Sequence, residues 1–211
     1  MVTTRPSATQ RRLLGLLYKD QLEGNRTTVK TLANSWNLDT AYARTLCQAV
    51  EEEGLVTSNY RGYRLTELGR SMIKVVFTGG VFDIIHPGHI HTLTSSRRLG
   101  DVLVVSVARN STVVKSKGHL PTHEESQRQE LVRSVRCVDV AVLGSETSIF
   151  ETVKMTKPDV IALGYDQSHK EQYVVEQSRK RGIKVKVVRL KSPIPKTKSS
   201  KLVKDGAIHV F

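Results

Sequence analysis

The sequence predicts an α/β fold in which a parallel β-sheet covered by helices follows a smaller, mainly helical domain. Residues 1–73 carry apolar residues at helical spacing, whereas residues 74–211 alternate short Val/Ile/Leu-rich segments with amphipathic ones. Continuous apolar strands separated by helices are typical of a parallel sheet buried on both faces. A chain of 211 residues, 38% hydrophobic and 25% charged, accommodates two small domains with packed cores. We therefore expect one domain over residues 1–73 and another over residues 74–211.

The first domain is expected to contain three helices, a hairpin and the start of a closing helix. Asp39 or Thr40 is a suitable N-cap for the third helix, and Gly54 a suitable end. The expected helices cover residues 9–20, 28–36 and 40–53, the hairpin strands cover 55–57 and 63–65, and the closing helix begins at 66–70.

This order of elements resembles the winged helix-turn-helix domain over residues 7–73. The resemblance implies a recognition helix at about 39–53, whose first turns meet DNA bases, and basic residues on the wing. The implied contact residues are Thr40, Tyr42, Arg44 and Thr45 on the helix, and Arg61 and Arg64 on the wing. However, ten basic and seven acidic residues give this domain a net charge of only +3, and the helix ends in three glutamates. A helical module for packing or dimerisation is the alternative.

The second domain is expected to alternate strands and helices. Pro87 suits the first turn of the first helix. Strands are expected at 74–78, 101–108, 138–143, 159–163 and 183–188, and helices at 88–98, 124–135, 148–155 and 170–181. Ligands of such a sheet bind at the carboxyl ends of its strands.

Charge and composition limit the partners and the compartment. The 33 Lys and Arg and 20 Asp and Glu give a net charge of +13, of which 23 minus 13, or +10, lies in residues 74–211. This balance indicates phosphate-bearing partners, either nucleic acid or small molecules. No apolar run is long enough for a membrane helix, no secretory signal is visible, and Cys47 and Cys137 have no CxxC neighbours. We expect a cytoplasmic protein with no membrane partner.

The most informative segment is Thr78–His89, where the first strand of the sheet ends and a helix begins. Gly79 and Gly80 permit a tight turn and close approach of a ligand to the backbone. The N-terminus of the next helix offers free N–H groups to a phosphate. His86 and His89 flank that helix start and could donate hydrogen bonds to phosphate oxygens. A GxGxxG dinucleotide motif is absent, which argues against a Rossmann dehydrogenase.

The segment GGVFDIIHPGH resembles the GxFDxxHxGH signature of the cytidylyltransferase-like nucleotidyltransferases, which have a Rossmann-like parallel sheet. These enzymes transfer a nucleoside monophosphate from ATP or CTP to a phosphate and release pyrophosphate. The resemblance implies catalytic roles for His86, His89 and Lys117. It implies nucleotide binding by Thr78, Gly79, Gly80, Val81, Phe82, His86, His89, Gly164, Asp166, Thr197, Ser199 and Ser200, and acceptor binding by Asp83, Lys117, Arg128 and Asp166. From the residues alone, Asp83 could instead orient the turn.

The expected reaction is in-line attack of an acceptor phosphate on the α-phosphorus of a nucleotide, with Mg²⁺ neutralising the leaving pyrophosphate. The segments 108–118, 124–128, 143–146 and 161–167 resemble the archaeal FAD synthetases, which adenylylate FMN with ATP. Two alternatives stay open: a cytidylyltransferase that acts on glycerol 3-phosphate or a phospho-alcohol with CTP, and a DNA-binding regulator whose second domain senses a nucleotide. Homodimers are common in the family, but no residue here decides the oligomeric state.

Overall fold

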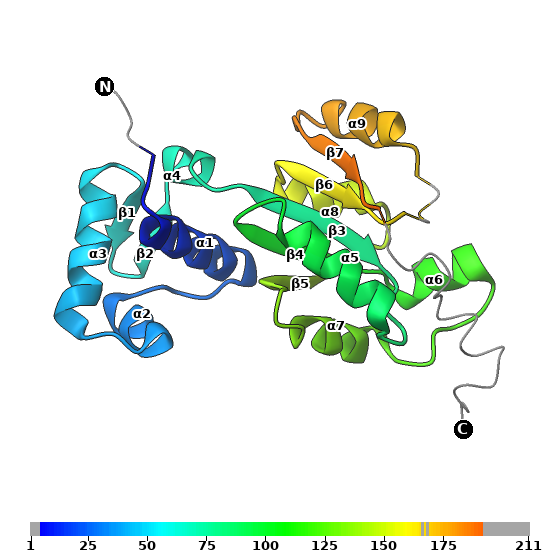
Figure 1. Ribbon diagram of the computed structural model, residues 1–211, viewed down its shortest axis with the longest axis horizontal. Helices are drawn as coiled ribbons and strands as arrows, with labels where there is room; N and C mark the ends of the chain where they lie inside the picture. Colours follow the sequence, from blue (N-terminus) through cyan, green and yellow to red (C-terminus); the bar gives the residue numbers. More distant parts are fainter. Residues whose placement is uncertain (1–4, 166, 168, 192–211) are drawn as a thin grey trace. The chain divides into compact units, whose positions relative to one another are not determined.

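The computed structural model describes residues 5–165, 167 and 169–191 (Figure 1). The chain divides into two compact units, and the division falls between Ile73 and Lys74. The same position marks the change in sequence pattern from helical spacing to alternating strands and helices.

The first unit contains three helices, a two-stranded antiparallel hairpin and a short fourth helix. These elements are α1 (Ala8–Glu23), α2 (Val29–Trp36), α3 (Thr40–Glu52), β1 (Val56–Asn59), β2 (Gly62–Leu65) and α4 (Glu67–Ser71). Every expected element of this unit is present, with ends that differ by at most a few residues.

Local capping explains where these helices begin. The Ser7 side chain accepts a hydrogen bond from the Gln10 N–H, and the Gln10 side chain accepts one from the Ser7 N–H, which forms a capping box at α1. Asp39 accepts hydrogen bonds from the N–H groups of Ala41 and Tyr42 at the start of α3. The inward side chains of the three helices are buried, among them Leu13, Leu14, Leu17, Leu32, Ala43, Cys47 and Val50.

The second unit is a five-stranded parallel sheet with helices on both faces. Its elements are β3 (Val75–Gly80), α5 (Pro87–Arg97), β4 (Val102–Val107), α6 (Asn110–Lys117), α7 (Glu125–Arg133), β5 (Val140–Leu143), α8 (Ile149–Thr156), β6 (Val160–Leu163), α9 (Glu171–Arg179) and β7 (Lys186–Arg189). The predicted α/β class and the parallel sheet are confirmed.

The strand order β5-β4-β3-β6-β7 determines where a ligand can bind. The chain builds outward from β3 to β5 and then returns to place β6 on the other side of β3. Crossovers therefore leave in opposite directions from β3 and β6, and a crevice opens between the carboxyl ends of such strands. Gly79 and Gly80 end β3 at this edge of the sheet, and Gly164 follows β6 there.

Three aspartates organise the opposite, amino edge of the sheet. Asp101 accepts a hydrogen bond from the Lys74 N–H, Asp139 from the Leu103 N–H and Asp159 from the Val75 N–H. Each carboxylate precedes one strand and satisfies a backbone donor at the start of its neighbour, which helps to set the register of β3, β4, β5 and β6.

The two faces of the sheet are packed differently. On the face covered by α5 and α7, a continuous core contains Val76, Leu93, Val105, Val132 and their neighbours (Figure 1). On the face covered by α8 and α9, strand residues of the opposite alternation, including Phe77, Ser106 and Ile161, border a cavity.

Helix α6 was not expected from the sequence. Its eight residues carry no clear apolar stripe, and Val113 is its buried side chain. The helix is instead fixed by contacts distant in sequence, because Glu125 accepts hydrogen bonds from the Asn110 N–H and from the Arg109 guanidinium. These contacts, and not helix propensity, determine where α6 begins.

Within residues 5–165, 167 and 169–191, no helix combines the length and the apolar character that a bilayer crossing requires.

Candidate active site

The turn after β3 has a constrained backbone. Phe82 adopts φ +53°, a left-handed conformation that is rare for a bulky side chain, yet its ring is 97% buried. A Cβ atom on Gly80 would lie 2.9 Å from the Phe82 ring, so glycine is required there. The turn therefore packs Phe82 back onto the end of β3 and directs the chain into α5.

His86 and His89 come together at the start of α5. His86 is the N-cap, and its Nδ1 accepts a hydrogen bond of 3.1 Å from the Gly88 N–H. The proton of the neutral His86 ring therefore lies on Nε2. The two imidazole rings are stacked, with centroids 4.0 Å apart, and Phe82 contacts His89 at 5.1 Å between centroids. Two ring donors thus meet the positive end of a helix, an arrangement suited to phosphate.

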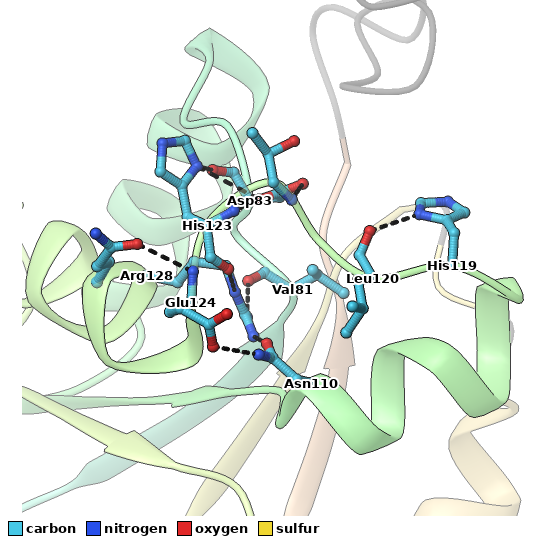
Figure 2. A network of polar contacts seen from close by, with 10 residues as sticks. Val81, Asp83, Asn110, His119, Leu120, His123, Glu124 and Arg128 are labelled. Atoms are coloured by element: carbon cyan, nitrogen blue, oxygen red, sulfur yellow. Dashed lines mark hydrogen bonds and ion pairs between the residues drawn. The ribbon is translucent and has the colours of Figure 1, made fainter. Parts of the chain in front are cut away.

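Arg128 is the hub of a buried polar network beside this turn (Figure 2). Its Nη1 donates to the Val81 carbonyl at 2.7 Å, its Nη2 to Asn110 Oδ1 at 2.7 Å and its Nε to the His123 carbonyl at 3.0 Å. The side chain is 0% exposed, and burial lowers the pKa of its guanidinium. Arg128 therefore connects the motif turn, the start of α6 and the loop before α7.

Asp83 fastens the same loop to the turn (Figure 2). Its two carboxylate oxygens accept hydrogen bonds from the Thr122 N–H at 2.9 Å and the His123 N–H at 3.0 Å. Burial by itself would raise the pKa of the Asp83 carboxyl, but these hydrogen bonds outweigh it and hold the pKa below its usual value. The contacts agree with the alternative that Asp83 orients the turn.

Lys117 lies in the last turn of α6, next to exposed Lys115. The start of this helix is held by Glu125, whose pKa is lowered by the hydrogen bonds from the Asn110 N–H and from Arg109. Arg109 also donates to the Gly144 carbonyl at 2.9 Å. The position of Lys117 thus depends on contacts with α7 and with the loop after β5.

The loop after β6 is fastened by two side chains that sequence reasoning did not single out. Gln167 donates to the Gly79 carbonyl at 2.7 Å and accepts from the Gly164 N–H at 3.2 Å, which joins the ends of β3 and β6. Arg189 donates to the carbonyls of Gly164, Gln167 and His169 and forms an ion pair with Glu171. Gln167 belongs to the 161–167 segment that carries the family resemblance, but the contacts of both side chains are mainly with backbone atoms, so their role is not visible in the sequence.

A cavity of about 640 Å³ opens at the carboxyl edge of the sheet. Its walls include the end of β3, the end of β4, the last turn of α6 and the loop between β5 and α8. Of the predicted site residues, Gly79, Gly80, Val81 and Lys117 line this cavity. His86, His89, Asp83 and Arg128 are not among the described residues that line it.

The remaining predicted residues are placed as follows. Thr78 is buried and its hydroxyl donates to the Ala162 carbonyl at 2.9 Å, so it joins β3 to β6. Gly164 is buried at the end of β6. Asp166, Thr197, Ser199 and Ser200 lie outside the described residues.

Together, the crossover point of the sheet and the paired imidazoles at a helix start define a class of α/β protein that handles nucleotide phosphates. Comparison with known families narrows this class to one family. Residues 77–205 match the cytidylyltransferase-like family, and the chain belongs to that family of nucleotidyltransferases.

The chain is similar to several archaeal enzymes. It is 53% identical over 120 residues to the FAD synthase of Aciduliprofundum boonei, a match covering 57% of this chain and 79% of that protein. It is 45% identical over 137 residues to the FAD synthase of Methanosarcina barkeri, and this match covers 65% of this chain and 94% of that protein.

A solved structure resembles part of the chain. The crystal structure of the lipopolysaccharide core biosynthesis protein from Thermoplasma volcanium GSS1 is 45% identical, with a TM-score of 0.55, and the match covers 57% of this chain and 98% of that one.

Proposed function

We propose that this nucleotidyltransferase transfers AMP from ATP to the phosphate of FMN and forms FAD. The observation that carries the proposal is the identity of 40–53% to archaeal FAD synthases, over matches that cover most of those proteins. The stacked pair of His86 and His89 at the helix start supports the proposal, because two imidazoles at this place suit the phosphates of a nucleotide.

The step requires no enzyme nucleophile. A phosphate oxygen of FMN attacks the α-phosphorus of ATP, a new P–O bond forms, and the bond between the α-phosphorus and the bridging oxygen to the β-phosphate breaks. Pyrophosphate leaves with the electrons of that bond. Catalysis then consists of positioning the two substrates and of stabilising the charge that develops on the phosphate oxygens.

His86 and His89 are proposed to donate hydrogen bonds to the α- and β-phosphates as this charge develops. Because the Nδ1 of His86 accepts a hydrogen bond from the Gly88 N–H, Nε2 is the nitrogen that carries the donor proton of the neutral ring. Lys117 is proposed to bridge the triphosphate and the acceptor phosphate from α6. Thr197, Ser199 and Ser200 remain proposed nucleotide ligands from the family resemblance, as does Asp166.

For Asp83 and Arg128 we propose positioning roles instead of contact with the acceptor phosphate. Both carboxylate oxygens of Asp83 and three nitrogens of Arg128 are engaged with protein atoms. Arg128 also has no exposed surface from which to meet a phosphate.

We propose that Mg²⁺ enters with ATP, held by its phosphates. Among the described residues, no group of three or more His, Cys, Asp or Glu side chains is arranged to hold a metal ion. A divalent ion on the triphosphate would neutralise the leaving pyrophosphate. Chelation by EDTA is therefore expected to abolish turnover, and added Mg²⁺ to restore it.

Pyrophosphate release tests the proposed reaction. The purified full chain is incubated with Mg²⁺, with ATP or CTP, and with FMN or glycerol 3-phosphate, and FAD is identified by chromatography. We expect release with ATP and FMN. Release with CTP and glycerol 3-phosphate alone would establish the cytidylyltransferase alternative, and nucleotide binding without release from any pair would favour a sensor.

We further propose that the first unit is a winged helix-turn-helix domain that binds DNA. In support, Arg44 and Thr45 near the start of α3 are exposed, and Tyr42 is 52% exposed. On the hairpin, Arg61 is exposed at the tip and its guanidinium lies 5.3 Å from the ring centre of Tyr60, which is 89% exposed. An aromatic and cationic tip of this kind suits a nucleic-acid backbone.

Binding to DNA upstream of the protein's own gene tests this domain at about 150 mM salt, where nonspecific binding is weak. We expect a retarded complex that Arg44→Ala and Arg61→Ala weaken and that Lys19→Ala, a charge-matched control on α1, does not. Equal affinity for unrelated DNA, or no complex, would leave the domain a packing or dimerisation role.

A further inference from the structure

The cavity at the carboxyl edge of the sheet shares Lys117 and the end of β3 with the phosphate chemistry proposed above, but most of its wall has no role in that chemistry. It exists because small residues stand where the other sheet face has large ones. Gly79, Ser106 and Ala108 border it, whereas Val105 and Val107 fill the opposite face. A Cβ atom on Gly79 would meet the Ile149 side chain at 3.7 Å, so even a methyl group would occupy part of the space.

The cavity wall is largely apolar. Phe77, Phe150, Val153 and Ile161 contribute to it, and Ile149 lies at its edge with about one-third of its surface exposed. A volume of about 640 Å³ lies within the roughly 300–1,000 Å³ of sites for cofactor-sized ligands. Burying this apolar surface favours a ligand with broad apolar faces.

One polar group inside the cavity lacks a partner. Ser106 is 1% exposed and lines the cavity, and its Oγ makes no hydrogen bond to any described residue. A buried hydroxyl without a partner is unfavourable, so a ligand that offers a polar atom at this depth gains affinity. The ligand must therefore combine apolar faces with a polar edge, as a fused aromatic heterocycle does.

Charged residues also line the cavity, namely Arg109, Lys115, Lys117 and Glu146. Lys115 and Lys117 line the cavity at its exposed side, next to Ser116. The histidine pair, proposed to hold the phosphates of ATP, is not part of this wall. A ligand whose ring occupies the cavity can thus extend a phosphate toward Lys117, where the two substrates would meet.

We infer that this cavity binds the isoalloxazine ring of FMN, with the Ser106 hydroxyl bonded to a polar atom of the ring and the FMN phosphate directed to Lys117. The inference rests on the proposed FMN adenylylation and assigns the acceptor to a particular place. Glycerol 3-phosphate has no apolar face and would leave most of the cavity unfilled.

Flavin binding to the full-length protein tests the inference, measured by the change in flavin fluorescence with FMN and with riboflavin, which lacks the phosphate. We expect both to bind, and excess glycerol 3-phosphate not to displace riboflavin. Ser106→Ala should raise the Kd for both flavins about 3- to 10-fold, as loss of one hydrogen bond does. Ser106→Leu, which fills the cavity, should raise it more than about 30-fold. The KM for ATP should stay within about twofold in each variant.

Two further variants guard against misfolding and nonspecific effects. Ile149→Ala removes apolar wall at a position that is already partly exposed, and should weaken riboflavin binding while the protein stays folded. Ser178→Ala is the matched control, because Ser178 is also buried with an unpartnered Oγ but is not among the described residues that line the cavity. It should leave flavin affinity unchanged.

The outcomes separate this inference from the proposed function. If the protein makes FAD but the Ser106 and Ile149 variants keep normal flavin affinity, the ring binds elsewhere and the inference is wrong. A rise in the KM for ATP without a change in flavin affinity would assign the cavity to adenine and also overturn it. If flavins bind as expected but no FAD forms, the proposed function fails while the cavity assignment stands.

Discussion

At the scale of single residues, the candidate site depends on side chains that fix the conformation of the backbone around it. Phe82 is held in a left-handed conformation, which costs free energy and persists because its ring is packed between Gly80 and His89. The turn then delivers His86 and His89 to the helix start in a fixed, stacked arrangement. Activity should therefore be sensitive both to the histidines and to the residues that hold the turn.

His89→Ala is expected to lower kcat for FAD formation by roughly 10²–10³-fold, because one donor to the developing charge is lost. The thermal unfolding temperature should change little, since the side chain lies at the edge of the core and the Phe82 turn keeps its other contacts. Steady-state kinetics and a melting curve measure the two effects. Turnover within tenfold of the wild type would remove His89 from the mechanism.

Arg128→Lys is expected to lower kcat by up to about 10²-fold while the KM for FMN changes less than about threefold. A lysine has its three donors on one nitrogen, so it cannot reach the three oxygens that the guanidinium contacts from three different nitrogens. The turn and α6 should then lose their alignment, and a small displacement of catalytic groups affects turnover more than binding. If Arg128 acts through Lys117, the double variant with Lys117→Ala should be no slower than Lys117→Ala alone.

Two results would contradict this positioning role. A large rise in the KM for FMN with kcat preserved would indicate direct contact with the acceptor phosphate. Additive losses in the double variant would show that Arg128 and Lys117 act independently. Asn110→Ala, which removes one branch of the network, gives the same comparison if Arg128→Lys is too unstable.

At the scale of elements, the segment from α6 to α7 is held by polar contacts to the turn that precedes His86. Asp83 fixes its loop and Glu125 fixes the start of α6. Both carboxyls have lowered pKa values. Lowered carboxyl pKa values stabilise the fold above the pKa of the unfolded chain, and this stability is lost as the pH falls through the folded pKa.

Asp83→Asn is expected to reduce stability at pH 7 and to flatten its decline below about pH 4. An amide retains one acceptor and turns its NH₂ group toward a backbone donor, so one hydrogen bond is lost; the variant also has no carboxyl to protonate. Urea unfolding at pH 7 and at about pH 3 measures both changes. Equal losses of stability in the two proteins on acidification would exclude a contribution from Asp83.

Sequence reasoning found most of these elements because their apolar patterns and caps are local. The strands of the sheet, the position of the Asp39 cap and the histidine turn were all expected from adjacent residues. It missed α6, whose start depends on Glu125 far along the chain, and the roles of Gln167 and Arg189 in the loop after β6. The family motif also predicted that Arg128 binds the acceptor phosphate, but a motif gives no information on burial, which is the basis for the positioning role proposed above.

At the scale of the whole molecule, net charge is divided unequally between the two units. Residues 1–73 carry +3 and residues 74–211 carry +10, from counts of 10 against 7 and 23 against 13. The second unit therefore has the stronger electrostatic attraction for polyanions, although the first carries the proposed DNA-binding helix. Binding experiments on the full chain must separate these two contributions.

Raising salt from about 50 to 200 mM should weaken binding to unrelated DNA steeply, since that binding is mainly the release of ions by Lys and Arg. ATP with Mg²⁺ should compete with this nonspecific binding if the basic surface lies at the nucleotide site. Fluorescence anisotropy with labelled duplexes measures both. Salt-independent binding to unrelated DNA would refute this account of the charge.

The three oxygens that Arg128 holds differ in how a change of amino acid affects them. Two are main-chain carbonyls, at Val81 and His123, which every amino acid possesses. Replacing Val81 by threonine therefore leaves that acceptor in place, and no exchange at 81 or 123 could compensate for losing the guanidinium. The contacts with these two carbonyls therefore produce no correlated substitutions among homologues. Their importance would be visible only as an invariant arginine at this position.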